Sequence, residues 1–167
     1  MIMYLRNSLG LPATGGFIPA GLPSFNAQTW GYDYDIAKSA QLLKEAGFPE
    51  GKGLPEFTLL TIPVYAELGS FVAKQLEDIG VKVQVEVVQK SLLLEQTAKS
   101  NALFFRGSWM ADYPDAENYL SVFYGKNPAP PNYTRYKNAA YDKLYEQALT
   151  EENDSLRYKM YNEMDKM

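Results

Sequence analysis

FTLLTIPVYAELGSFVAKQLEDIGVKVQVEV, residues 57–87, is the stretch that decides the fold. The run 57–62 is apolar, as in a buried strand, and residues 66–79 repeat their apolar side chains at helical spacing. From Val81 to Val87, valines alternate with polar residues, which is typical of a strand covered on one face. Strand, helix and strand in this order predict a parallel βαβ unit, whose crossover is nearly always right-handed. We therefore expect an α/β fold, an open sheet flanked by helices.

A loop and a helix precede this unit. Residues 10–31 contain three prolines and five glycines, which interrupt any periodic pattern and predict an ordered loop that bears aromatic side chains. Residues 35–49 read DIAKSAQLLKEAGFP and predict a helix. Asp35 is its candidate N-cap, while Gly47 and then Pro49 end it.

Downstream, the pattern continues with one more strand and several helices. A short helix begins at Ser91, and the apolar run at 102–109 predicts a third strand. Another short helix covers 117–124, and two helices follow a proline loop, at 138–149 and from Asn153 onward. We expect a single α/β lobe, which divides into a loop-rich N-terminal segment at 1–34, a core at 35–137 and C-terminal helices at 138–167.

Composition excludes several classes of function. Sixteen Lys and Arg against twenty Asp and Glu give a net charge of −4 without a basic run, so nucleic acid is not an expected partner. The chain has no His and no Cys, which removes imidazole bases, thiolate nucleophiles and the usual ligands of zinc and iron–sulfur clusters. We expect no cofactor and no metal site. The apolar runs are too short to span a membrane.

The C-terminal helix has no stop signal. Residues 153–167 read NDSLRYKMYNEMDKM, a helical pattern with no Gly, Asn or Pro to end it. We therefore expect the chain to be a portion of a longer protein.

The acidic segment SWMADYPDAEN, residues 108–118, follows the third predicted strand. Asp115 stands where a helical pattern begins, so we expect it to cap that helix. Glu117 then falls in the first turn, where a negative charge suits the helix dipole. Asp112 has no such structural role. It lies past the carboxyl end of a strand, where open α/β sheets bind their ligands.

Several uses of these carboxylates remain to be weighed. A glycosidase needs two carboxylates that flank the scissile bond, but Asp115 is better used as a cap. A calcium loop needs alternating ligands and a Gly in the turn, which this segment lacks. Asp112 could instead receive a ligand's ammonium group, with Trp109 as an apolar wall. Alternatively, Asp112 is an ordinary exposed acid and Trp109 is part of the core.

Two segments in the first half of the chain resemble motifs of a known family. Residues 35–49 resemble D-P-x-x-A-x-x-L-L-x-E-A-G-[YF]-P, with Ile36 in place of the usual proline. Residues 71–88, FVAKQLEDIGVKVQVEVV, resemble the family's Q-L-x-x-I-G-[IV]-x-V strand start.

Two further segments extend the resemblance. Residues 108–118 resemble W-x-x-D-[YF]-x-D-P-x-N, with Ala116 where proline is common. Residues 136–149, followed by Arg157 and Tyr161, resemble N-x-x-[YF]-D-x-L-[IL]-x-x-A and then R-x-x-x-[YL]. In this order and spacing, the four segments resemble the bacterial extracellular solute-binding proteins of family 5, which are the oligopeptide- and dipeptide-binding receptors of ABC importers.

The resemblance implies a type II periplasmic-binding-protein-like lobe. In such a receptor two lobes close on the ligand, and this chain corresponds to most of the smaller, C-terminal lobe. Asp112 then pairs with the peptide's α-amino group and Trp109 lines a side-chain pocket. Arg106 holds a peptide carboxylate or makes an internal ion pair. The backbone from Arg106 to Met110, including Ser108, is a strand that an extended peptide joins.

The sequence therefore predicts a peptide-binding transport component, not an enzyme. Its expected partners are a peptide ligand, the ABC permease in the membrane and the missing first lobe, and we expect a monomer. The resemblance implies a periplasmic or extracytoplasmic location, with a lipid anchor as one option for the full-length protein. Three alternatives stay open: a receptor of the same family for oligosaccharide or another solute, a carboxylate-based hydrolase, and an interaction module that uses the Pro, Gly and Tyr surface of residues 10–34.

Overall fold

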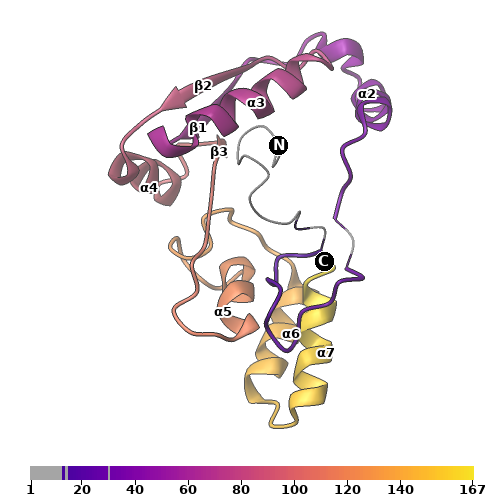
Figure 1. Ribbon diagram of the computed structural model, residues 1–167, viewed down its shortest axis with the longest axis vertical. Coiled ribbons are helices and arrows are strands. Elements are labelled where there is room, and N and C mark those ends of the chain that lie inside the picture. Colours follow the sequence, from indigo (N-terminus) through magenta and orange to yellow (C-terminus); the bar gives the residue numbers. More distant parts are fainter. Residues whose placement is uncertain (1–12, 14, 30) are drawn as a thin grey trace. The chain divides into compact units, whose positions relative to one another are not determined.

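The predicted strand–helix–strand stretch is a parallel βαβ unit in the computed structural model, which describes residues 13, 15–29 and 31–167. The described chain forms two compact units, one from residues 33–107 and the other from residues 13–32 and 108–167. In the first unit the elements are α2 (Ile36–Glu45), η1 (Pro49–Gly51), β1 (Phe57–Thr61), η2 (Pro63–Tyr65), α3 (Ala66–Glu77), β2 (Val83–Val87), α4 (Lys90–Ala98) and β3 (Phe104–Phe105). In the second they are α5 (Ala116–Leu120), η3 (Ser121–Phe123), α6 (Ala139–Thr150) and α7 (Asp154–Met164) (Figure 1).

The sheet of the first unit has the order β2–β1–β3, with both neighbours parallel to β1. The helix α3 packs on the face that carries Leu59, Thr61 and Val85. Gly69 permits this close packing, because a Cβ there would lie only 3.1 Å from Cγ1 of Val85. These elements confirm the predicted α/β class.

The loop after α2 meets the turn between α3 and β2 at two glycines. A Cβ on Gly80 would lie 2.0 Å from the carbonyl oxygen of Glu50, and a Cβ on Gly51 would lie 1.9 Å from that of Gly80. Both glycines also have positive φ, 69° at Gly51 and 87° at Gly80. Only residues without a side chain fit this backbone contact.

The third strand is much shorter than predicted. Pairing with β1 covers only Phe104 and Phe105, and the last bond beyond them runs from the amide of Arg106 to the carbonyl of Leu60, at 2.9 Å. Past Thr61, the neighbouring chain turns into η2 at Pro63, so among the described residues no strand continues beside residue 107 and those after it. The prediction of a strand over 102–109, with an extended backbone from Arg106 to Met110, was therefore wrong in length.

The helix predicted at 35–49 is confirmed as α2, with the side chain of Asp35 accepting from the amide of Lys38 at 2.8 Å. No residue of α2 is buried among the described residues, and Ile36 and Leu42 are both about half exposed. In the described part of residues 10–31, no helix forms, as the sequence predicted.

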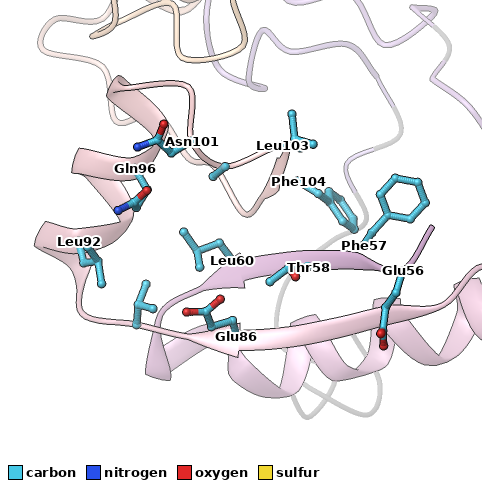
Figure 2. Close-up of a pocket in the computed structure, with 12 residues that line it drawn as sticks. Glu56, Phe57, Thr58, Leu60, Glu86, Leu92, Gln96, Asn101, Leu103 and Phe104 are labelled. Atoms are coloured by element: carbon cyan, nitrogen blue, oxygen red, sulfur yellow. The ribbon is translucent and has the colours of Figure 1, made fainter.

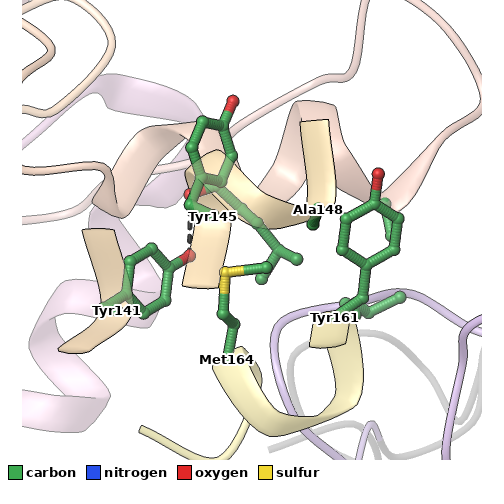
Figure 3. Close-up of a cluster of buried hydrophobic side chains, with 8 residues drawn as sticks. Tyr141, Tyr145, Ala148, Tyr161 and Met164 are labelled. Carbon is green, nitrogen blue, oxygen red and sulfur yellow. Dashed lines mark hydrogen bonds between the residues drawn. The ribbon is translucent and has the colours of Figure 1, made fainter. Parts of the chain in front are cut away.

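A tyrosine-rich core holds the second unit together (Figure 3). The helices α6 and α7 pack against each other and α7 packs on α5. The hydroxyl of Tyr141 donates to the carbonyl of Leu120 at 2.8 Å, so the buried phenol is paired. The core consists of Ile18, Ala116, Leu120, Tyr141, Tyr145, Ala148, Tyr161 and Met164.

The N-terminal loop is attached to this core through Asp165, which follows α7. Its carboxylate accepts from the amides of Phe17, at 2.6 Å, and Ile18, at 3.2 Å. The side chain of Ile18 is almost fully buried in the tyrosine-rich core. Residues far apart in the sequence therefore form one unit, and residues 19–22 line the same hollow as Tyr119 of α5.

Candidate functional site

Two of the three carboxylates in the acidic segment have structural partners. Asp115 caps α5, since its side chain accepts from the amide of Glu117 at 2.8 Å, which confirms the predicted N-cap. Glu117 accepts hydrogen bonds from the hydroxyls of Tyr113 and Tyr145. Burial, followed by the hydrogen bond to Glu117, raises the pKa of Tyr145 above its ordinary value. Neither carboxylate is therefore free to act on a ligand without the loss of these contacts.

Asn118 connects the two residues that the sequence proposed for ligand binding. Its side chain is buried in α5, and its Oδ1 accepts from Nε1 of Trp109 at 2.9 Å and from the amide of Asp112 at 3.2 Å. One amide oxygen thus fixes both the indole ring and the backbone that carries the carboxylate. Asn118 was part of the recognised motif, but sequence reasoning gave it no role. No local sequence signal indicates this role, because it depends on contacts between α5 and the preceding loop.

Asp112, which carries the third carboxylate, is exposed and lines an open hollow. The hollow has a volume of about 570 Å³ and is lined by Pro19, Ala20, Gly21, Leu22, Ala111, Asp112, Tyr113, Pro114 and Tyr119. Within the described residues, no hydrogen bond or ion pair involves the carboxylate of Asp112. A solvated carboxylate beside aromatic rings can accept a cationic group of a ligand.

The other predicted site residues divide between the two units. Trp109 is half-buried, whereas Ser108 and Met110 are exposed, and all three belong to the second unit with Asp112. Arg106 belongs to the first unit, is half-buried and places its guanidinium carbon 3.4 Å from the ring centroid of Tyr65. The structure thus joins Trp109 to Asp112 through Asn118. The combined site of five residues stays a prediction.

Another hollow, of about 500 Å³, lies on the sheet of the first unit (Figure 2). Thr58, Leu60 and Glu86 point into it, on the face opposite α3, and Leu92 and Gln96 of α4 close one end. Parallel sheets are normally covered on both faces. We therefore interpret this hollow as an uncovered sheet face, and it contains none of the predicted site residues.

The described residues contain no group of three or more acidic side chains arranged to hold a metal ion. Among these residues, no helix combines the length and the apolar character that crossing a bilayer requires.

The fold is that of a lobe of the type II periplasmic binding proteins, as the solved structures of similar proteins show. Residues 1–131 match the model of the bacterial extracellular solute-binding proteins, family 5 middle, and the chain belongs to this family. The family predicted from the sequence motifs is thereby confirmed.

Two curated proteins illustrate the relatives to which the chain is similar in sequence. Di/tripeptide-binding protein 1 of Pseudomonas aeruginosa is 28% identical over 149 residues, which are 80% of this chain and 27% of that protein. The glutathione-binding protein GsiB of Escherichia coli strain K12 is 27% identical over 159 residues, 90% of this chain and 30% of that protein. The chain spans less than a third of the length of either relative.

Solved structures agree with the fold. The periplasmic murein tripeptide binding protein MppA, in its unliganded open form, superposes with a TM-score of 0.87 at 25% identity, over 99% of this chain and 33% of that one. The periplasmic binding protein DppA from Helicobacter pylori, in complex with the peptide STSA, gives a TM-score of 0.81 at 26% identity, over 90% of this chain and 30% of that one.

Proposed function

We propose that this chain forms part of the substrate-binding component of an ABC importer, and that the intact receptor binds peptides between two lobes without chemical turnover. Asp112 is the anchor for the ligand's α-amino group. The observation that carries the proposal is the exposed residue Asp112, which lines a hollow and whose carboxylate has no partner among the described residues. The relatives support it, because they are named for di- and tripeptides, glutathione or a murein tripeptide.

Electrostatics make this anchor strong enough to orient a ligand. At an effective dielectric constant of about 20, a carboxylate about 4 Å from an ammonium gains on the order of 4 kcal/mol before desolvation is subtracted. Asn118 holds the backbone of Asp112, so little conformational freedom is lost there on binding. Trp109, fixed by the same side chain, provides an apolar wall beside the anchor.

The remaining predicted residues complete the proposed receptor. Arg106 receives the peptide's carboxylate, while Ser108 and Met110 offer main-chain groups to an extended ligand. The first lobe supplies the other half of the cleft, and closure of the two lobes excludes water from the contact with Asp112. The receptor acts in the periplasm or another extracytoplasmic space, as a monomer that delivers peptide to its permease.

The contacts of the neighbouring carboxylates argue against the hydrolase alternative. A glycosidase would need a second available carboxylate across the hollow from Asp112. The nearby candidates are Asp115 and Glu117, and both are hydrogen-bonded within the second unit. An oligosaccharide receptor would instead depend on Tyr113 and Tyr119, which line the same hollow.

Calorimetric titration of the two-lobed receptor separates these functions. Di- and tripeptides with a free amino terminus should bind, and N-acetylation of the same peptides should weaken binding by tenfold or more, because it removes the ammonium charge. Uncharged oligosaccharides should not bind. Equal binding of free and acetylated peptides would refute the anchor, and binding of oligosaccharides alone would replace the peptide proposal with a sugar receptor.

A further inference from the structure

The hollow beside Asp112 has apolar and aromatic walls. Among the described residues that line it, Asp112 is the only charged one, and the others are Pro19, Ala20, Gly21, Leu22, Ala111, Tyr113, Pro114 and Tyr119. A cationic group held by Asp112 therefore has apolar surface next to it. An anionic group of a ligand would find no Lys or Arg among these lining residues.

Tyr113 forms one wall, and its ring is held at the hydroxyl end. About half of the residue is exposed, and its hydroxyl donates to the carboxylate of Glu117. The same carboxylate accepts from the hydroxyl of Tyr145, which is buried in the tyrosine-rich core. The ring is thus connected to the core through one carboxylate. A ring held in this way loses little conformational freedom when a ligand packs on it.

Tyr119 forms another wall and is supported by a neighbouring ring. Its ring centroid lies 6.2 Å from that of Phe17, and the two rings meet edge to face at 73°. Phe17 packs in turn on Phe123, with centroids 4.9 Å apart, and its amide donates to Asp165 at 2.6 Å. The two tyrosines of the hollow therefore have separate supports, and both are in place before a ligand binds.

Residues 19–22 supply a third, apolar wall. Ile18, directly before them, is buried in the tyrosine-rich core, and Leu22 packs against the same core. The carbonyl of Leu22 also accepts from the amide of Phe25 at 2.9 Å. Both ends of this short loop are thus held, so the hollow keeps its shape without a ligand.

We propose that this hollow receives the side chain of the ligand's first residue, and that Tyr113 and Tyr119 make the receptor prefer peptides with a large apolar side chain there. The inference rests on the proposed function, because Asp112 has to hold the α-amino group. The same Cα carries the ammonium and the first side chain, so an anchored ammonium places that side chain beside Asp112. An aromatic side chain leaves water and packs on the two rings, which should raise affinity about tenfold over alanine. An acidic side chain would instead be repelled by the carboxylate of Asp112.

The test titrates the two-lobed receptor by calorimetry with three tripeptides that differ only in their first residue, Phe-Ala-Ala, Ala-Ala-Ala and Glu-Ala-Ala. The wild type should bind Phe-Ala-Ala about tenfold more tightly than Ala-Ala-Ala, and Glu-Ala-Ala most weakly. Replacing both rings, by Tyr113→Ser together with Tyr119→Ser, should reduce the preference for phenylalanine over alanine to less than about twofold.

Tyr133→Ser is a matched control, because Tyr133 belongs to the same unit and does not line the hollow. It should keep the tenfold preference. The preference is a ratio of two affinities measured on one variant, so a smaller folded fraction does not change it. Circular dichroism of each variant checks the fold independently.

Two results would overturn the inference: equal binding of Phe-Ala-Ala and Ala-Ala-Ala by the wild type, or an undiminished preference in the double variant. N-acetylated forms of the same peptides separate this failure from that of the proposed function. If acetylation weakens binding and no preference for phenylalanine exists, the anchor at Asp112 survives and the pocket is refuted. If acetylation has no effect, the anchor is refuted, and the assignment of the hollow to the first side chain with it.

Discussion

Replacing Asn118 with leucine tests the connection between Trp109 and Asp112. Leucine has nearly the shape of asparagine but cannot accept the two hydrogen bonds, from Nε1 of Trp109 at 2.9 Å and from the amide of Asp112 at 3.2 Å. A typical hydrogen bond contributes about 1 kcal/mol net. Because Trp109 is half-buried and Asp112 exposed, water can reach both freed donors, and no larger penalty is expected. The predicted loss of unfolding free energy is about 2 kcal/mol.

Urea unfolding of the 167-residue chain, followed by circular dichroism, measures this loss. With a denaturant slope of about 2 kcal/mol per molar, the midpoint of Asn118→Leu should fall by roughly 1 M. Asn127→Leu is a matched control, because Nδ2 of Asn127 makes one hydrogen bond, to the carbonyl of Ser121 at 2.9 Å. Its midpoint should fall by about half as much.

A double-mutant cycle isolates the indole contact. Trp109→Phe removes the Nε1 donor and keeps an aromatic ring, so Asn118→Leu should cost about 1 kcal/mol less in that background than in the wild type. An equal cost in both backgrounds would show that Asn118 does not hold the indole. A cost below about 0.5 kcal/mol in the wild type would refute the reasoning altogether.

Two other features give predictions of stability. Gly80→Ala should cost more than about 2 kcal/mol in thermal unfolding, because a Cβ would lie 2.0 Å from the carbonyl of Glu50. Gly21→Ala, also at positive φ but with no atom within 4 Å, should cost only about 1 kcal/mol, and equal losses would contradict the backbone contact. Burial raises the pKa of the three core tyrosines, Tyr141, Tyr145 and Tyr161. Their protonated form is then favoured in the folded state, so the contribution of these tyrosines to the unfolding free energy should be constant below about pH 10 and fall above it, by up to about 1.4 kcal/mol per pH unit for each tyrosine. Urea titrations at increasing alkaline pH measure this slope, and a flat profile would contradict it.

Local sequence signals were sufficient for most of the fold. The caps at Asp35 and Asp115 were readable because an acidic side chain precedes a helical pattern, and the βαβ unit was readable from its change of periodicity. The end of β3 could not be predicted from the sequence, since it depends on where the neighbouring chain turns away at Pro63. The run at 102–109 is apolar enough for a longer strand, but β3 can extend only as far as its partner strand β1 continues beside it.

In the candidate site too, some features could be predicted from the local sequence and others could not. Asp112 was proposed by elimination, because the sequence indicated a structural use for its neighbour Asp115, and its role as a ligand contact stays a prediction. The role of Asn118 depends on contacts between a helix and a loop. No local pattern encodes such contacts. The organisation of residues 1–167 as one lobe remains a prediction, and residues 1–12, 14 and 30 lie outside the described part.

The central claim is that the carboxylate of Asp112 binds a ligand's ammonium group, and a coupling energy between the two tests it most directly. Wild-type and Asp112→Asn receptors are each titrated with one tripeptide and with its N-acetylated form. We predict that Asp112→Asn weakens binding of the free peptide tenfold or more and leaves the acetylated peptide unchanged, a coupling of at least about 1.4 kcal/mol. If the substitution weakens both ligands by the same factor, the coupling is zero and Asp112 does not contact the amino terminus.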